Sequence, residues 1–160
     1  MKKKAWKKIR LLALDFDGVM TDGKVIVRED GLESVTCSRR DALGISMLTK
    51  IGVKVVVISK EKNPVVAARC KKLKIECFSG VDDKPAILKD LLARERVDPR
   101  HVCYVGDDVI DVECMKLVGI GVAVADAVRQ AKDAADYVTT AKGGDHAVRE
   151  VCDLILDAKR

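Results

Sequence analysis

Aromatic residues are scarce in this chain: only 3% of its 160 residues are Phe, Trp or Tyr. Proteins that bind nucleic acid by base stacking need exposed aromatic side chains beside their basic ones. The net charge is +5, and basic residues are concentrated within residues 1–8. Without an aromatic platform elsewhere, we expect residues 1–8 to form a solvated basic arm and expect no nucleic-acid partner. A positive field can also attract an anionic substrate.

Long hydrophobic runs are also missing. The first apolar stretch is cut short by Asp15 and Asp17, whereas a membrane span needs about 20 apolar residues and a signal peptide an uninterrupted apolar core. The six cysteines include no Cys-x-x-Cys pair, and most lie in apolar surroundings, as buried free thiols do. We therefore expect a cytoplasmic protein with no signal peptide and no membrane association.

Strand-like and helix-like segments alternate along the chain, which contains no internal repeat, low-complexity tract or linker. The pattern predicts strands over 9–14, 53–58, 75–78, 101–105, 120–124 and 137–140. It predicts helices over 40–50, 63–72, 84–94, 112–118, 127–134 and 145–159. Such alternation indicates one Rossmann-like α/β domain over 1–160, with a mostly parallel sheet flanked by helices. Two short β-like runs around a Gly-containing turn predict a β-hairpin over 24–37.

Two acids, Asp15 and Asp17, follow the first apolar strand directly, and Asp22 lies close behind them. Acids and glycines at a strand end are common in plain turns. Three acids this close would repel one another, however, and a hard cation such as Mg²⁺ prefers oxygen ligands and would remove that repulsion. We favour a metal site over a plain turn.

Polar side chains also follow the later strands. Ser59 ends the second long strand, Lys84 opens a helix, and three acids follow the strand at 101–105, namely Asp107, Asp108 and Asp111. Each has an ordinary explanation as a turn cap, a surface charge or a helix N-terminal acid. Since the carboxyl ends of parallel strands share one edge of a sheet, we expect them to meet Asp15 and Asp17 there. Together they offer a nucleophile, an acid/base, phosphate ligands and metal ligands.

These ordered motifs resemble the haloacid dehalogenase superfamily of phosphotransferases over nearly the whole chain. The resemblance implies that Asp15 is the nucleophile that forms an aspartyl phosphate and that Asp17 is the general acid and base. It implies Mg²⁺ bound by Asp15, the main-chain carbonyl of Asp17 and Asp107. Ser59 and Lys84 would hold the phosphoryl group. In supporting roles, Asp108 and Asp111 would orient either the water molecules around the metal or the side chain of Lys84.

Between Asp22 and the helix near Asp41 there is room for a hairpin but not for a cap domain. With Thr21-Asp22-Gly23, the segments 122–127 and 134–139, and the tail after Gly143-Gly144, this resembles the capless branch of the superfamily. That branch contains the 3-deoxy-D-manno-octulosonate 8-phosphate phosphatases and relatives that act on nine-carbon sialic-acid-type phosphates. The resemblance implies a phosphorylated sugar acid as substrate and a homotetramer in which the hairpin at 24–37 is an assembly element.

The residues after Ser59 leave the substrate open. The octulosonate phosphatases usually follow this serine or threonine with Gly-Arg, whereas this chain has Lys60-Glu61. Glu61, with Arg69 and Lys72 on the next helix, resembles relatives that hydrolyse nine-carbon 9-phosphates; Arg69 and Lys72 would bind the sugar carboxylate. The alternative is a solvated basic helix face. His146 stands where relatives often carry Gly. It either alters how the tail of a neighbouring subunit fits the active site or lies inert on the surface.

Two other classes of protein compete with the enzyme. One is a non-catalytic partner of an acylneuraminate cytidylyltransferase that keeps the fold. The intact set of Asp15, Asp17, Ser59, Lys84 and Asp107 argues against it, because a retired site has no reason to keep mutually repelling acids. The other is a signalling receiver domain, which does not place a nucleophile and an acid/base two residues apart after its first strand.

Overall fold

The centre of the molecule is strand β1 (Leu11–Leu14), whose four apolar residues are all fully buried. The computed structural model describes residues 3–160. A strand that is apolar on both faces belongs in the middle of a parallel sheet. Accordingly, β1 pairs in parallel with β4 (Lys54–Ile58) on one side and β6 (Val102–Gly106) on the other, and Leu14 lies opposite Val57 and Val105.

Six strands form the main sheet in the order β5-β4-β1-β6-β7-β8. The outer members are β5 (Glu76–Phe78), β7 (Ile120–Ala123) and β8 (Tyr137–Val138). Every neighbouring pair is parallel, so all carboxyl ends lie at one edge. The predicted fold class, a mostly parallel sheet flanked by helices, is confirmed.

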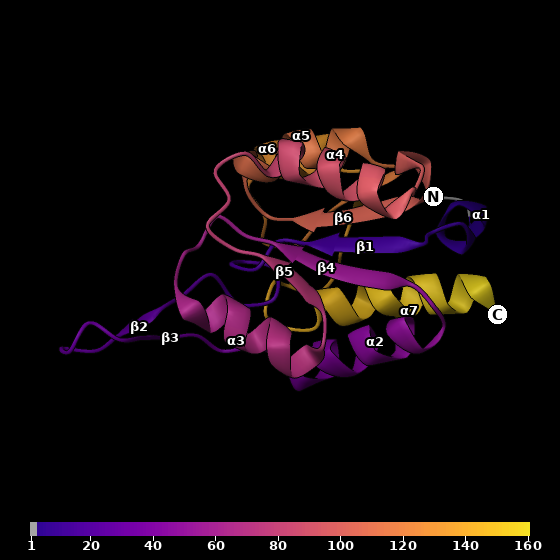
Figure 1. Ribbon diagram of the computed structural model, residues 1–160. Coiled ribbons are helices and arrows are strands. Elements are labelled where there is room, and N and C mark those ends of the chain that lie inside the picture. The colour runs from indigo at the N-terminus through magenta and orange to yellow at the C-terminus, as the bar shows by residue number, and fades with distance from the viewer. Residues whose placement is uncertain (1–2) are drawn as a thin grey trace.

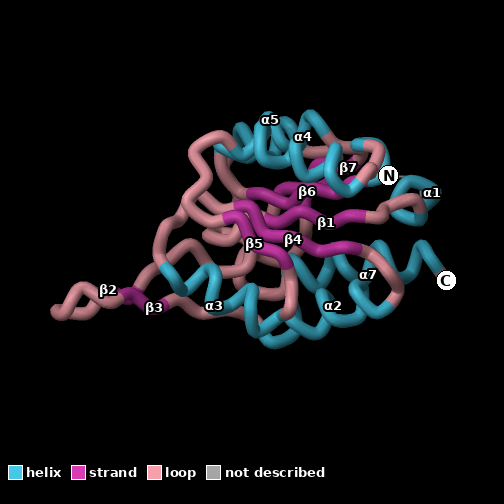
Figure 2. The backbone as a smooth tube through the Cα atoms, viewed as in Figure 1, coloured by secondary structure: helices cyan, strands magenta, loops and turns pink. Residues whose placement is uncertain are grey.

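Helices cover both faces of the sheet and give the molecule three layers (Figures 1 and 2). One face holds α2 (Arg39–Lys50), α3 (Pro64–Leu73) and α7 (Ala147–Lys159). The other holds α4 (Lys84–Glu95), α5 (Val112–Leu117) and α6 (Arg129–Ala134). Two short 3₁₀ helices, η1 (Pro99–His101) and η2 (Val109–Asp111), flank β6. None of the helices described over residues 3–160 has the length and hydropathy to cross a membrane.

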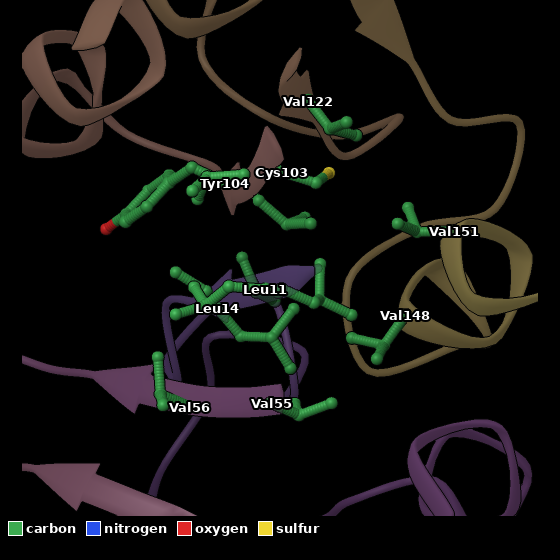
Figure 3. Packing of buried hydrophobic residues seen from close by; sticks show 14 of the residues in the cluster. Leu11, Leu14, Val55, Val56, Cys103, Tyr104, Val122, Val148 and Val151 are labelled. Atoms are coloured by element: carbon green, nitrogen blue, oxygen red, sulfur yellow. The ribbon is translucent and has the colours of Figure 1, made fainter. Parts of the chain in front are cut away.

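The core lies between the sheet and the two helix layers. Figure 3 shows Val148 and Val151 of α7 facing the side of the sheet that presents Leu11 and Val55. All four of these residues are at most 3% exposed. Asn63 caps α3: its side chain accepts a hydrogen bond from the N–H of Val65 at 3.0 Å, which satisfies a free donor at the start of the helix.

The predicted hairpin is present but its ladder is short. It consists of β2 (Ile26–Val27) and β3 (Glu33–Ser34), which pair antiparallel. Figure 1 shows it projecting from the body at the edge where the strands of the main sheet end. Ile26 and Val27 are 62% and 64% exposed.

The N-terminal segment differs from the solvated arm that its charge suggested. Residues Lys3–Lys7 form helix α1, and Trp6 is only 4% exposed. Its ring meets that of Tyr137 edge to face, with centroids 5.9 Å apart, and Lys159 of α7 donates to the carbonyl of Lys7 at 3.0 Å. The expectation was wrong because one buried indole fixes a segment that its lysines alone would leave in water. Met1 and Lys2 lie outside the described residues.

Candidate active site

Asp15 continues β1 by one residue, since its N–H donates to the carbonyl of Val105 at 2.9 Å. Its side chain turns inward and is almost fully buried. The N–H of Phe16 donates to Asp15 Oδ1 at 2.7 Å. Burial, together with the charge of Asp111, raises the pKa of Asp15 well above its ordinary value, although Lys84 opposes the shift. The carboxylate therefore stays charged only with positive charge beside it.

Lys84 supplies that charge from the first residue of α4. Its ammonium lies 2.8 Å from Asp15 Oδ1 and 2.9 Å from Asp111 Oδ1, and all three side chains are at most 6% exposed. Although burial opposes it, the pair of carboxylates raises the pKa of Lys84, so the ammonium remains charged.

Asp111 is a fully buried acceptor at the end of η2. Its Oδ1 accepts from Lys84 and from the Tyr104 hydroxyl at 2.7 Å. Its Oδ2 accepts from the N–H groups of Asp107 and Asp108 at 3.1 and 3.3 Å. Four donors occupy the two oxygens, which leaves little capacity for a metal ion.

Asp107 follows β6 and faces the loop after Asp15. Gly18 adopts a φ of +77°, and a methyl group there would overlap the carboxylate of Asp107. Only glycine therefore lets the two segments approach this closely. Burial and the charges of Asp111 and Asp108 raise the pKa of Asp107 to about 7. A half-buried carboxylate held beside other acids is repelled by them, and a bound cation would relieve that repulsion.

A cavity of about 380 Å³ opens at this edge of the sheet. Its wall includes Asp15, Asp17, Ser59, Glu61, Asp107 and Asp108. Ser59 is buried, and its Oγ accepts from the N–H of Glu61 at 3.1 Å, which leaves the hydroxyl proton available for a ligand. Burial and the nearby Glu61 raise the pKa of Asp17, as a general acid requires.

The residues present fit a magnesium ion. Carboxylate oxygens of Asp15, Asp107 and Asp111 lie within 4.8 Å of one another. Since Asp111 is already saturated with donors, Asp15 and Asp107 are the carboxylates with free capacity. Within residues 3–160, no hydrogen bond is made to the main-chain carbonyl of Asp17, so that oxygen is also free. Mg²⁺ prefers such an all-oxygen set.

Not every residue predicted for the site lines the cavity. Lys84 lies behind Asp15 rather than in the wall. Arg69 donates to the carbonyl of Ser38 at 3.2 Å, Lys72 is exposed on α3, and neither contributes to the wall. His146 precedes α7, pairs with Asp145 at 3.0 Å and is likewise outside the wall.

Two residues that shape the site were not predicted. Thr21 is fully buried, and its hydroxyl accepts from the N–H groups of Gly18 and Gly23 at 3.2 and 3.1 Å, which closes the loop after Asp17. Tyr104 donates to Asp111 from the middle of β6. Thr21 stands between acids and glycines, where a polar cap is a reasonable expectation. Tyr104 stands in an apolar strand and gives no such signal.

Residues 45–151 match the model of the haloacid dehalogenase-like hydrolase family. The chain belongs to this family. It is 43% identical over 152 residues to the 3-deoxy-D-manno-octulosonate 8-phosphate phosphatase KdsC of Escherichia coli (strain K12). The aligned region covers 94% of this chain and 81% of the relative. The expectation of a phosphomonoesterase of this superfamily is confirmed by this membership and this relative.

Solved structures agree closely with the fold. The 3-deoxy-D-manno-octulosonate 8-phosphate phosphatase from Moraxella catarrhalis, in complex with magnesium, phosphate and KDO, has a TM-score of 0.95 and 35% identity and covers 98% of this chain and 91% of its own. The cobalt-bound form of the enzyme from Haemophilus influenzae has a TM-score of 0.93 and 34% identity, and it covers 97% of this chain and 91% of its own. With the oxygen ligands described above, the magnesium-bound structure from Moraxella catarrhalis confirms the predicted magnesium cofactor.

Proposed function

We propose that this chain is a magnesium-dependent phosphatase that hydrolyses 3-deoxy-D-manno-octulosonate (KDO) 8-phosphate through an aspartyl phosphate on Asp15. The main observation is the convergence of Asp15, Asp17 and Asp107 on one cavity, next to Ser59. The E. coli relative, at 43% identity, supports the eight-carbon substrate. When bound, the cation neutralises phosphoryl oxygens and offsets the repulsion among the carboxylates.

In this mechanism a carboxylate oxygen of Asp15 attacks phosphorus, and the bond to the sugar oxygen breaks. Asp17 gives its proton to the leaving oxygen and later takes one from the water that hydrolyses the aspartyl phosphate. Its raised pKa suits both roles. The Ser59 hydroxyl donates to a phosphoryl oxygen. Lys84 holds Asp15 in its charged form from behind and adds positive charge at the phosphoryl group.

Asp108 and Asp111 have supporting roles in this proposal. Asp111 fixes Lys84 through the 2.9 Å contact and orders the turn that carries Asp107. Asp108 starts η2 by accepting from the N–H of Val109 at 2.6 Å and also faces the cavity. From there it is placed to orient water around the cation.

A nine-carbon sugar acid 9-phosphate is the second candidate substrate. The observation in its favour is Glu61, which lies in the cavity wall and can accept a hydrogen bond from a sugar hydroxyl. Arg69 and Lys72 lie outside that wall, so a role in binding the sugar carboxylate requires a neighbouring subunit to close the site over α3. A non-catalytic partner of a cytidylyltransferase is the alternative from another class, and the acids kept at the cavity speak against it.

We further propose a homotetramer assembled through the hairpin and located in the cytoplasm. Val25, Ile26, Val27 and Leu32 of the hairpin are 47–64% exposed, and an exposed apolar edge needs cover. All six cysteines are free thiols, as a reducing compartment favours.

The test is phosphate release from KDO 8-phosphate and from nine-carbon 9-phosphates side by side, with Mg²⁺ and with EDTA. Asp15→Asn is the control. Magnesium-dependent release from the eight-carbon ester that disappears in the variant supports the proposal. Preference for the nine-carbon esters moves the assignment to the second candidate. No release from any ester by folded protein contradicts both and favours the non-catalytic partner.

A further inference from the structure

Tyr104 is a fully buried phenol in the middle of β6. Figure 3 shows its ring extending away from the neighbouring Cys103 and Val122, with the hydroxyl oxygen at the far end. A hydroxyl buried without a partner is costly, and this one donates to Asp111 Oδ1 at 2.7 Å. Burial and the charge of Asp111 raise the pKa of Tyr104 well above its ordinary value, so the phenol stays a donor.

The oxygen that accepts from Tyr104 also accepts from Lys84, at 2.9 Å. The other oxygen of Asp111 is fixed by two main-chain N–H groups. Gly106 also packs closely against Asp111, since a methyl group at Gly106 would overlap the Asp111 side chain. Main-chain N–H groups therefore anchor one oxygen of Asp111. Among residues 3–160, Tyr104 is the only rigid donor to the other oxygen, which also meets Lys84. The ammonium of Lys84 itself sits on a flexible four-carbon chain, so it does not fix the position of Asp111 Oδ1.

We propose that Tyr104 is a positioning residue, whose hydroxyl fixes Asp111 Oδ1 and thereby holds the ammonium of Lys84 beside Asp15. Without that hydroxyl, Asp111 Oδ1 interacts with Lys84 alone and draws the ammonium away from Asp15. The nucleophile then loses its only cation within the described residues. This inference rests on the proposed function, since it assigns Tyr104 a role in the reaction at Asp15.

The chain offers a matched control because it has only two tyrosines. Tyr137 also donates to a carboxylate, Glu150 Oε1, at 2.8 Å, but Glu150 lies outside the wall of the active-site cavity. Tyr104→Phe and Tyr137→Phe therefore remove the same atom and the same kind of hydrogen bond. We expect Tyr104→Phe to lower kcat by about tenfold or more, as loss of a supporting partner in an active site does. KM should stay within about twofold, and Tyr137→Phe should leave kcat unchanged.

A second readout reports on Lys84 directly. The ¹⁵N resonance of its buried ammonium should shift in Tyr104→Phe and stay in place in Tyr137→Phe. Incorporation of p-aminophenylalanine at position 104 restores a donor at the same place and should recover kcat and the ¹⁵N position. If Tyr104→Phe does not fold, the p-aminophenylalanine variant still tests the proposal, because recovery of kcat and of the ¹⁵N position then still requires a donor at position 104.

Equal kcat values for the two phenylalanine variants, with an unchanged ¹⁵N position of Lys84, would overturn the proposal and leave Tyr104 a core residue. If p-aminophenylalanine fails to restore kcat in folded protein, the proposal is also overturned. If the wild-type chain hydrolyses no phosphate ester, the proposed function fails, and the ¹⁵N comparison decides separately whether Tyr104 holds Lys84.

Discussion

Lys84 and Asp15 form an ion pair 2.8 Å long in which neither side chain is more than 6% exposed. Removing one partner of a buried pair leaves the other charge unpaired. We predict that Lys84→Met abolishes phosphatase activity and lowers the free energy of unfolding by about 3 kcal/mol. Urea unfolding in EDTA measures the second effect without a contribution from metal binding.

The control for Lys84→Met is Lys116→Met. Lys116 forms an exposed pair with Glu113 at 2.9 Å on α5, and such a surface pair contributes about 0–1 kcal/mol. Similar losses of stability in the two variants would mean that the buried pair is no stronger than a surface one.

Gly18 gives a steric prediction. A methyl group at this position meets the carboxylate of Asp107, and the φ of +77° adds strain for any L side chain. Gly18→Ala should therefore displace Asp107 and weaken Mg²⁺ binding, measured by calorimetry, along with activity. Gly52→Ala is the matched control, because Gly52 has a φ of +81° but open space around it. It should lose about 1 kcal/mol of stability from backbone strain and keep its Mg²⁺ affinity.

If both alanine variants keep the wild-type Mg²⁺ affinity, the close approach of Gly18 to Asp107 does not matter for the metal. If both lose it, backbone strain rather than the contact is responsible.

These contacts separate what the sequence predicts from what it does not. The strand that ends in Asp15 and Asp17 is predictable because an unbroken apolar run has few alternatives to a central strand. The meeting of Ser59, Asp107 and Asp15 follows from parallel strand order alone. Tyr104 is different: its place in a continuous apolar run marks it as core, and nothing local shows which acid its hydroxyl reaches. Likewise, only packing against Tyr137 shows that Trp6 folds the basic N-terminus back onto the body.

Glu150 gives the pH prediction. Although partial burial opposes it, hydrogen bonds from the N–H groups of Ala141 and Thr140 hold the pKa of Glu150 below its ordinary 4.5. A carboxyl with a lowered pKa in the folded state stabilises the fold above its unfolded pKa and loses that contribution as the pH falls through the folded value. Glu150→Gln should therefore cost about 1–2 kcal/mol at pH 7, and the difference from wild type should shrink below about pH 4.5.

Unfolding by urea between pH 3 and pH 7 measures this dependence. The control is Glu113→Gln on the exposed face of α5, which should track the wild type throughout. A difference between Glu150→Gln and wild type that is independent of pH would show that the charge of Glu150 does not stabilise the 137–141 segment.

The hairpin gives a prediction about assembly. Ile26 and Val27 are exposed in the single chain, and a charge placed there would be buried unpaired if the hairpin joins subunits. Ile26→Glu should reduce the assembly to smaller species in sedimentation velocity. Leu43→Glu, at a site that is 55% exposed on α2, should sediment like the wild type. An unchanged tetramer in Ile26→Glu would remove the hairpin from the assembly.

The most direct test of the proposed chemistry is to trap the phosphorylated residue. Asp17→Asn should slow hydrolysis of the aspartyl phosphate, because the variant lacks the base that activates water. Acid quench of this variant with KDO 8-phosphate and Mg²⁺, followed by peptide mass spectrometry, locates the phosphoryl group. We expect the phosphoryl group on Asp15, and we expect none in Asp15→Asn. A phosphoryl group on another residue, or hydrolysis by wild type with no phosphorylated enzyme in any variant, would contradict the assignment of Asp15 as nucleophile.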